Sequence, residues 1–205
     1  MYKYTFTVFT PTYNRVNTLP RCYTSLLSQD FKDFEWLIVD DGSTDNTKEL
    51  IESFISENKI NIRYVYQVNS GKHVATNKGV DLAQGKYFFI LDSDDALTSS
   101  SLTNLLNAYN SIPEMQKESF TGVEGLSYTF DGKLIGTEFP SLNGFDMFDS
   151  SYLDMRLKYN VLGDKHGFIK TDIMKNSLSL FLKKKNLLLK LSFGTKSDYI
   201  IRLVL

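Results

Sequence analysis

The chain has 205 residues, of which 42% are hydrophobic and 14% aromatic, and its net charge is −1. This composition excludes a disordered chain and supplies enough apolar residues for one α/β domain with a sizeable core. The small net charge gives no bulk attraction to nucleic acid or to an anionic membrane, so no nucleic-acid partner is predicted.

Four predicted strands alternate with helices over the first half of the chain. Runs of aromatic, aliphatic and β-branched residues predict strands at residues 4–10, 35–39, 62–67 and 86–91. Apolar residues three or four apart predict helices at residues 18–27, 45–56, 73–83 and 99–110. Thr18 and Asp45 (or Ser43) are predicted helix caps, and Gly85 is predicted to close the third helix. The alternation favours right-handed βαβ units, hence a mostly parallel, Rossmann-like sheet with helices on both faces.

The first of these helices contains the single cysteine, Cys22. One cysteine excludes a disulfide framework and fits a reducing compartment. Its place in the apolar helical pattern predicts that Cys22 packs as a small apolar residue and is not a nucleophile. No long apolar run is present at the start or elsewhere, so we expect neither a signal peptide nor a membrane-spanning helix.

Three of the strands run directly into polar loops. These loops read PTYNR at residues 11–15, DDGSTD at residues 40–45 and DSDD at residues 92–95. Because the carboxyl ends of parallel strands meet at one edge of a sheet, we expect the three loops to converge on one cleft. This convergence favours a functional site. No GxGxxG follows the first strand and no GxxxxGK[ST] occurs, so neither a dinucleotide fingerprint nor a P-loop is present.

The fourth strand is a continuous apolar run, which is typical of a strand buried on both faces. It delivers three carboxylates that repel one another unless something positive shares the site. A divalent cation that bridges to phosphates is one interpretation, because magnesium usually takes one or two protein carboxylates together with substrate phosphate oxygens. A solvated acidic turn that caps the next helix is the other.

A second, mixed or antiparallel section is predicted beyond residue 113. The elements expected there are a hairpin at residues 122–135 with its turn at Asp131-Gly132, a partly helical stretch at 145–159, a short strand at 167–170 and a short helix capped by Thr171.

The chain resembles the inverting family-2 glycosyltransferases of GT-A fold in four motifs, which occur in the family's order and spacing. These motifs are TVFTPTYNR, LIVDDGSTDNT, NSGKHVATNKGVDLAQGKYFFILDSDD and GDKHGFIKTDIMK. The likeness extends over residues 6–175. It implies one α/β domain of GT-A fold at 1–175, with a nucleotide-binding half at 1–111, the start of an acceptor half at 112–175, and a non-matching tail at 176–205.

The resemblance implies a glycosyltransferase that moves a sugar, with inversion, from a nucleotide-sugar to a glycan or lipid-linked acceptor. A UDP-sugar is the expected donor, and Mn²⁺ or Mg²⁺ the expected cofactor. The family also implies a role in polysaccharide biosynthesis and a cytoplasmic location, including the inner face of the membrane. Physically, the metal would stabilise the charge that develops on the diphosphate leaving group, and a base would take the proton from the acceptor hydroxyl.

Nucleotide-sugar binding is implied at the positions that match the family's motifs, namely Pro11, Tyr13, Arg15, Asp40, Asp41, Asn77, Asp92, Ser93 and Asp94. Asp94 would be the main metal ligand, with Asp92 as a further ligand towards the ribose. Tyr13 would lie against the base, and Asp41 or its neighbour Asp40 would accept a hydrogen bond from the base.

Asp164 and Lys165 would border the acceptor side. The chain departs from the family at Thr76, where many relatives have arginine. One cation on the phosphate side is therefore missing, unless Lys72 or Lys78 substitutes for it in part.

Simpler explanations stay open for some of these residues. One alternative is that Asp40 and Asp45 simply cap a helix and bind no ligand. Another is that Tyr13 is an ordinary aromatic residue of the loop. His73 and His166 have no partner at metal-ligand spacing, so neither is predicted to be a ligand or a base.

The tail departs from the family pattern, and no Asp or Glu occurs between Asn176 and Ser197. In relatives this segment carries acidic residues, including the expected catalytic base, so no catalytic residue is assigned. As written, the lysines and leucines of the tail favour an interfacial amphipathic helix and peripheral membrane association. The alternative we prefer is a shifted reading frame. Permitted codons from Asn176 onward, read one base earlier, allow KFPFPFFEEEKFITEAFIWNKI, which resembles the missing segment. The chain would then be an impaired nucleotide-sugar-binding fragment that lacks the base.

Overall fold

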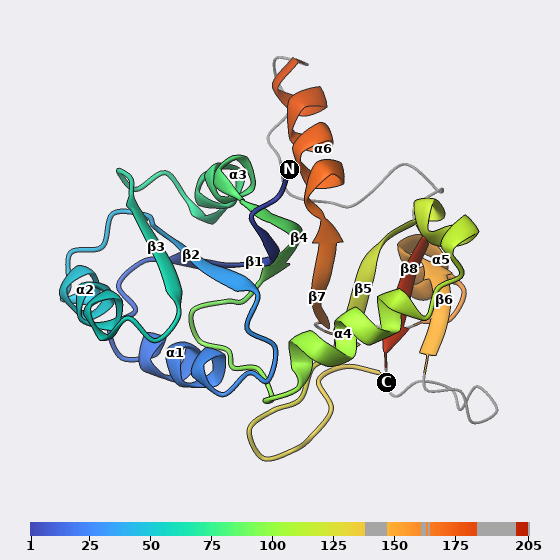
Figure 1. Ribbon diagram of the computed structural model, residues 1–205, viewed down its shortest axis with the longest axis horizontal. Helices are drawn as coiled ribbons and strands as arrows, with labels where there is room; N and C mark the ends of the chain where they lie inside the picture. The colour runs from blue at the N-terminus through green and yellow to red at the C-terminus, as the bar shows by residue number, and fades with distance from the viewer. Residues whose placement is uncertain (138–146, 161–162, 164, 184–199, 205) are drawn as a thin grey trace. The chain divides into compact units, whose positions relative to one another are not determined.

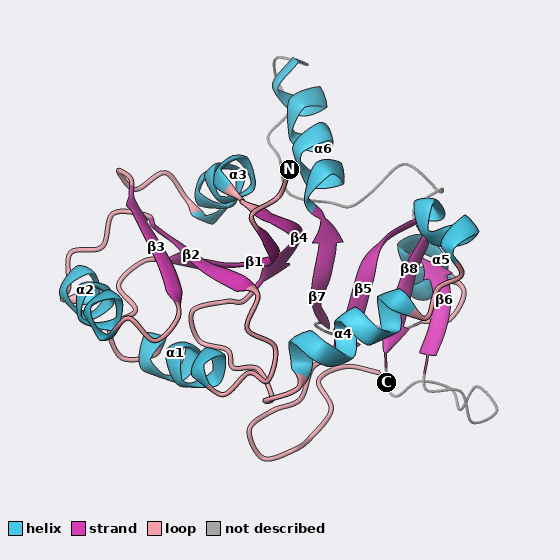
Figure 2. Cartoon of the chain, in the orientation of Figure 1, coloured by secondary structure: helices cyan, strands magenta, loops and turns pink. Residues whose placement is uncertain are grey.

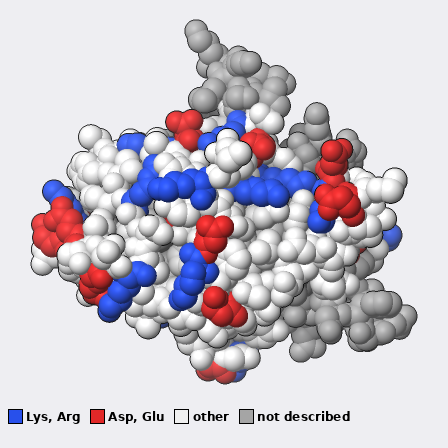
Figure 3. Space-filling model, viewed as in Figure 1, with Lys and Arg blue, Asp and Glu red and all other residues white. Residues whose placement is uncertain are grey.

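The computed structural model describes residues 1–137, 147–160, 163, 165–183 and 200–204. The chain divides into two compact units, a first unit of Met1–Thr103 with Lys170–Leu191 and a second unit of Asn104–Ile169 with Ser192–Leu205. No helix among the described residues is both long and apolar enough to cross a membrane. Basic and acidic side chains both lie on the face shown in Figure 3, in keeping with the net charge of −1.

The first unit is built on a parallel sheet. Its strands are β1 (Tyr4–Thr12), β2 (Phe34–Asp40), β3 (Asn61–Tyr66) and β4 (Gly85–Ile90). They lie in the order β3-β2-β1-β4, and each neighbouring pair is parallel. The four strands predicted from the alternating pattern are therefore confirmed, with ends that shift by one or two residues.

Helices cover both faces of this sheet, as predicted. Figure 1 shows α1 (Leu19–Leu27) and α2 (Thr47–Glu57) on one side and α3 (Lys72–Leu82) on the other. On the first side, the Tyr23 ring of α1 lies 6.0 Å from Trp36 of β2 and 4.1 Å from Phe54 of α2, between ring centroids. On the opposite side, α3 approaches β1 so closely that a Cβ on Gly79 would lie 2.2 Å from the Phe9 ring. The large rings of alternate strand residues thus form the two layers of the core.

Gly85 does not close α3, contrary to the prediction. The helix ends at Leu82, and Gly85 is the first residue of β4. A Cβ on Gly85 would lie 2.1 Å from the backbone nitrogen of Thr7, so glycine is required by the close approach of β1. The helix that follows residue 170, α6 (Thr171–Lys183), is longer than predicted and includes the first residues of the tail. Its Thr171 hydroxyl donates to the Gly85 carbonyl at 2.7 Å.

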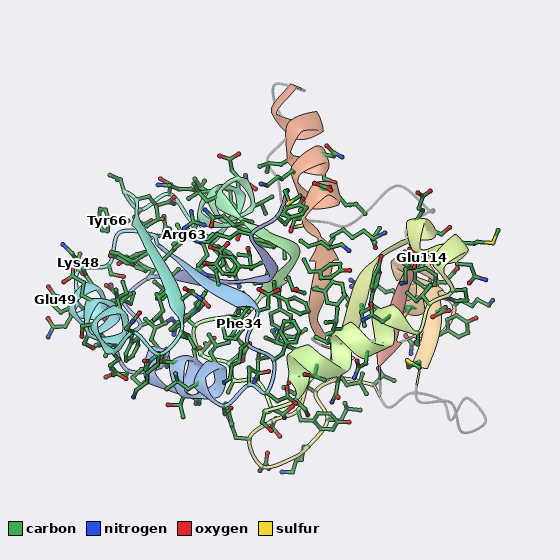
Figure 4. The ribbon with its side chains drawn as sticks, viewed as in Figure 1. Phe34, Lys48, Glu49, Arg63, Tyr66 and Glu114 are labelled. Atoms are coloured by element: carbon green, nitrogen blue, oxygen red, sulfur yellow. The ribbon has the colours of Figure 1, made fainter. Side chains whose placement is uncertain are left out.

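A charged network lies inside the first unit. The carboxylate of Glu35 in β2 is fully buried and accepts hydrogen bonds from the Thr7 hydroxyl (2.6 Å), the Arg63 guanidinium (2.7 Å) and the Gln84 backbone N–H (2.8 Å). Arg63 reaches it from β3 and also donates to the Leu82 carbonyl at 3.0 Å (Figure 4). A buried carboxylate is stable only when it is paired and hydrogen-bonded in this way.

The substitution Arg63→Met should therefore destabilise the protein. It leaves the Glu35 charge buried without its cation, so we expect the free energy of unfolding to fall by about 2–4 kcal/mol. Urea unfolding followed by circular dichroism measures this change. The control is Lys48→Met, which removes the exposed ion pair between Lys48 and Glu52 and should leave the unfolding midpoint unchanged. Equal, small effects of both substitutions would contradict the assigned role of Arg63.

The second unit contains the mixed section. Its strands are β5 (Phe120–Leu126), β6 (Met147–Ser151), β7 (Lys165–Lys170) and β8 (Ile200–Val204), in the order β7-β5-β8-β6. β5 is antiparallel to β7 and parallel to β8, and β6 is antiparallel to β8. The helical elements around these strands are the 3-10 helix η1 (Glu114–Ser119), α5 (Tyr152–Leu157) and α4 (Ser101–Asn110), which begins in the first unit (Figure 2). The predicted mostly parallel α/β fold with a mixed section is confirmed.

The predicted hairpin in this unit is confirmed at its turn and along its short second arm, residues 133–135. The Gly132 N–H donates to the Thr129 carbonyl at 2.9 Å, and Gly132 has φ of 84°. The Thr129 N–H donates to the Lys133 carbonyl and the Ile135 N–H donates to the Ser127 carbonyl, both at 2.8 Å, on either side of a bridge between Tyr128 and Leu134. The principal partner of β5 in the antiparallel sense is β7, some 40 residues further along the chain. The short arm thus pairs with residues 127–129, while residues 122–126 pair with β7.

Candidate functional site

The three polar loops meet at the carboxyl edge of the parallel sheet in the first unit. The Asp41 N–H donates to the Thr12 carbonyl at 2.8 Å, which ties the end of β2 to the end of β1. On the other side of β1, the Leu91 N–H donates to the Phe9 carbonyl at 2.9 Å and carries β4 to the start of the acid loop, residues 92–95. The predicted convergence of the loops is thus seen in the backbone.

Asn14 fastens the first loop to the second. Its backbone adopts the left-handed conformation with φ of 53°, which asparagine tolerates better than most residues. Its side-chain oxygen accepts from the backbone N–H groups of Thr44 (2.8 Å) and Asp45 (3.3 Å), and its own N–H donates to the Ser43 hydroxyl at 2.9 Å. The two loops therefore form one rigid rim. The sequence placed Asn14 in the motif without showing this role.

Asp45 adds a second link between these loops. Its carboxylate accepts from the Val16 N–H at 3.3 Å and from the Thr47 N–H at 3.1 Å. The N-cap of α2 is Asn46, one residue later than predicted. Burial raises the pKa of Asp45, but the hydrogen bonds from Thr47 and Val16 outweigh burial, so the pKa is lowered overall.

The lowered pKa of Asp45 predicts a pH dependence. The stabilisation is fully present above the ordinary pKa of aspartate, near about 4, and is lost as the pH falls through the lowered pKa of the folded state. We expect the free energy of unfolding to decrease below about pH 4, and Asp45→Asn to remove part of that decrease. Urea unfolding at a series of pH values from neutral to acidic tests this. An unchanged acid slope in the variant would contradict it.

The two aspartates that end β2 have different surroundings. Asp40 is fully buried and accepts from the Ser43 N–H and the Tyr64 hydroxyl, both at 2.8 Å. Burial, together with the hydrogen bond to Asp40, raises the pKa of Tyr64, so this hydroxyl stays a donor. Both carboxylate oxygens of Asp40 are thus engaged in holding the loop.

Asp41 organises the approach to α3. One carboxylate oxygen accepts from the Gln67 amide (2.7 Å) and the Ser70 N–H (2.8 Å), and the other accepts from the Gly71 N–H at 2.7 Å. The second oxygen has a lone pair left for a further donor. Asp40 is 0% exposed and Asp41 is 5% exposed, so Asp41 is the one of the two that a ligand can reach.

Two cations face the carboxylates of the acid loop. The Lys72 ammonium, in the first turn of α3, lies 2.7 Å from both carboxylate oxygens of Asp92 and donates to Oδ2. The Arg15 guanidinium lies 3.9 Å from Oδ2 of Asp94. The Asp94 side chain is 51% exposed and that of Asp92 is 31% exposed. Carboxylates and cations from three segments of the chain thus surround an accessible polar site.

These residues fit a divalent cation. The Thr12 hydroxyl at the end of β1 is buried and has no hydrogen-bond partner among the described residues, and a buried polar atom of this kind calls for an ion or water. Oδ1 of Asp92 is buried too, with the Lys72 ammonium 2.7 Å away. No group of three or more metal-ligating side chains occurs among the described residues. The two carboxylates correspond to the small number of protein ligands that magnesium usually takes when substrate phosphates complete its shell.

The remaining sequence-predicted donor residues differ in how exposed they are. Pro11 and Ser93 are buried, Asn77 is half-buried on α3, and Tyr13 is 47% exposed. Exposure leaves the Tyr13 ring available to a flat ligand group.

Lys72 and Lys78, the two lysines considered as substitutes for an arginine at position 76, contact different parts of the first unit. Thr76 turns its hydroxyl to the Lys72 carbonyl at 2.8 Å and so stays within α3. Lys78 donates to the Tyr66 carbonyl at the end of β3, at 3.4 Å. Of the two lysines, Lys72 is the one that contacts the acid loop.

The residues predicted for the acceptor side belong to the second unit. Asp164 lies outside the described residues, and Lys165 donates to the Gly163 carbonyl at 3.2 Å. A carboxylate that sequence reasoning missed, Glu124 of β5, lies near Lys165 and His166 of β7. Burial raises the pKa of Glu124, while the positive charges of Lys165 and His166 oppose that rise.

Sequence comparison finds relatives among glycosyltransferases. The profile of Glycosyl transferase family 2 matches residues 7–115. The uncharacterized glycosyltransferase YibD of Escherichia coli is 36% identical over 99 residues, which are 48% of this chain and 28% of that protein. The GalNAc(5)-diNAcBac-PP-undecaprenol beta-1,3-glucosyltransferase of Campylobacter jejuni is 32% identical over 133 residues, which are 64% of this chain and 38% of that protein. The chain thus spans well under half the length of these relatives.

Structure comparison gives matching folds. S. aureus TarS 1-349 in complex with UDP-GlcNAc is 26% identical, with a TM-score of 0.61 over 84% of this chain and 47% of that chain. The complex of the same protein with UDP gives a TM-score of 0.62, also at 26% identity. The mixed α/β architecture therefore matches that of GT-A glycosyltransferases.

Proposed function

Because the chain belongs to glycosyl transferase family 2, we propose that its first unit binds a nucleotide-sugar, and that the enzyme transfers the sugar with inversion and with a divalent metal. The observation that carries the proposal is the pairing of Lys72 with Asp92 and of Arg15 with Asp94 at the carboxyl edge of the sheet. A diphosphate needs cations around its oxygens, and a metal needs carboxylates. Both are present at this edge of the sheet.

The residues of the first unit have distinct roles in this proposal. Asp94, with Asp92, would hold the metal, and the metal when bound would stabilise the negative charge of the diphosphate leaving group. Arg15 and Lys72 would turn to the phosphate oxygens once Asp94 and Asp92, their present partners, hold the metal. The exposed Tyr13 ring would stack on the base.

Asp41 completes the nucleoside side of the proposed site. It would accept a hydrogen bond from an N–H of the base at its second oxygen, while its other oxygen keeps Gln67 and Ser70 in place. A carboxylate can only accept, so Asp41 would favour bases with an N–H at that edge, such as uracil, over bases with an acceptor there.

The donor and acceptor are proposed from the relatives. UDP-sugar is the proposed donor class, supported by the TarS complexes with UDP and UDP-GlcNAc. A glycan or lipid-linked acceptor is supported by the undecaprenol-linked substrate in the name of the Campylobacter jejuni relative. Such a reaction would belong to polysaccharide biosynthesis and would take place in the cytoplasm, at the inner face of the membrane where the acceptor is lipid-linked.

Ligand-induced stabilisation tests the donor site. The protein is heated with UDP, GDP, CDP or ADP, each with Mn²⁺ and with EDTA. We expect UDP with Mn²⁺ to raise the melting temperature most, because a ligand at 100 times its Kd adds about 2.7 kcal/mol to the stability of the folded state. Equal stabilisation by all four nucleotides, or none, would overturn the proposed donor class. If UDP raises the melting temperature equally with Mn²⁺ and with EDTA, the proposed role of the metal in donor binding is overturned.

A second candidate function is nucleotide-sugar binding without efficient transfer. It is favoured by one observation, the absence of any Asp or Glu between Asn176 and Ser197. A base for the acceptor hydroxyl would then have to come from elsewhere. The nucleotide sequence around the Lys175 codon decides whether the tail arises from a shifted frame. If it does, reading the codons one base earlier from that point gives the acidic segment.

A further inference from the structure

Two adjacent residues of α1, Arg21 and Cys22, contact the backbone carbonyl groups of the acid loop. The Cys22 sulfur lies 2.9 Å from the Asp95 carbonyl oxygen and 3.3 Å from that of Asp92. The neighbouring Arg21 guanidinium donates to the Asp94 carbonyl. Three of the four carbonyl groups in the acid loop are thus directed at one turn of α1, about 70 residues earlier in the sequence.

The Cys22 thiol is suited to donate and unsuited to react. It is fully buried, and burial raises its pKa to about 12, with the nearby charge of Asp95 acting in the same direction. The sulfur lies within hydrogen-bond distance of both carbonyl oxygens, so the thiol can donate to either of them. Cys22 packs in the core as predicted, but its hydrogen bonds to the acid loop could not be anticipated from helical spacing.

The acid loop needs such support. Its carboxylates repel one another, and within the loop the Asp95 N–H donates to the Asp92 carbonyl at 3.0 Å. The Asp92 carbonyl therefore receives both this N–H and the Cys22 thiol. A contact from α1 at each end of the turn limits its backbone to one shape, and Arg21 adds a positive charge beside the acids.

We propose that Arg21 and Cys22 are positioning residues that fix the backbone of the acid loop, so that the carboxylates of Asp92 and Asp94 are preorganised for a divalent cation. The inference rests on the proposed function for its consequence, because the cation is the one required there. Neither residue needs to touch the ligand. Their effect reaches the metal through the loop carbonyls, and for Arg21 also through its charge.

Two readouts test this inference on the full chain. The first is amide hydrogen exchange of the acid loop without ligand, and the second is the ratio of UDP affinity with Mn²⁺ to that with EDTA, from calorimetry. For Cys22→Ala and for Arg21→Met we expect exchange at the Asp95 amide to speed up about three- to tenfold, and the Mn²⁺ enhancement to fall by a similar factor. UDP affinity in EDTA should not change.

Matched variants separate positioning from general loss of stability. Cys22→Ser restores a donor and should return both readouts to the wild-type values. Ser25→Ala removes a buried hydroxyl of the same helix that donates to the Cys22 carbonyl and not to the acid loop, so it should leave both readouts unchanged. Exchange that is unaltered in Cys22→Ala and Arg21→Met overturns the inference. Faster loop exchange in those variants, with no Mn²⁺ enhancement in the wild type, overturns the proposed function while keeping the support of the loop.

Discussion

Replacing Asp94 with asparagine is expected to remove the Mn²⁺-dependent part of UDP affinity and to lower any glycosyl transfer by about 10²–10³-fold. The amide has the size of the carboxylate but lacks its charge, so a hard cation loses its principal anionic oxygen. Calorimetric titration of UDP with Mn²⁺ and with EDTA measures the effect. The variant should bind UDP equally in both, at the affinity that the wild type shows in EDTA.

The same substitution should leave the fold intact. Asp94 is half-exposed, and its ion pair with Arg15 spans 3.9 Å, so its loss costs little stability. The matched control is Asp81→Asn, which makes the same chemical change at an exposed carboxylate on α3 and should behave as the wild type does. A variant Asp94→Asn that retains the Mn²⁺ enhancement would show that the acid loop is not the metal site and would favour the acidic-turn interpretation.

The outline of this site could be predicted from local patterns. The buried strand that ends in DSDD became β4. Its neighbour β1, and β2 on the other side of β1, end in the other two loops at the same edge. Strand periodicity and the parallel topology suffice for this, because both follow from short-range sequence. The same information placed helices on both faces of the sheet.

The division of labour between Asp40 and Asp41 required the register of the sheet. Asp40 pairs with Tyr66 across the β2–β3 ladder, and this register brings the Tyr64 hydroxyl to Asp40 and the Gln67 amide to Asp41. A shift of one residue would exchange these partners. Nothing in the local sequence sets that register.

The remaining features could not be predicted because they depend on contacts between residues far apart in the sequence. Cys22 was predicted to pack as an apolar residue, and its burial is confirmed, yet its partners in the acid loop lie about 70 residues away. Gly85 resembled a helix terminator because glycine is common there. Its actual requirement is the approach of β1, a contact with Thr7 that only the folded sheet creates.

If the reading frame is shifted, restoring it should greatly raise the rate of sugar transfer. A chain in which KFPFPFFEEEKFITEAFIWNKI replaces the residues after Lys175 is expected to transfer sugar at least about 10²–10⁴-fold faster than the 205-residue chain, the range that a positioned general base contributes. Release of UDP from UDP-sugars in the presence of membrane and glycan acceptor fractions measures this. UDP affinity with Mn²⁺ should be the same in both chains, because the donor residues all precede the replaced segment.

The control for this experiment carries the same segment with each glutamate changed to glutamine. It keeps the length, the aromatic residues and the packing of the restored segment and removes only its carboxylates, so it should bind UDP and release little of it. Restored activity in this control would show that packing of the segment matters and not its acids. Transfer by the unaltered 205-residue chain at the rate of the restored chain would refute the hypothesis, and a base within the described residues, with Glu124 as the first to replace by glutamine, would then have to be sought.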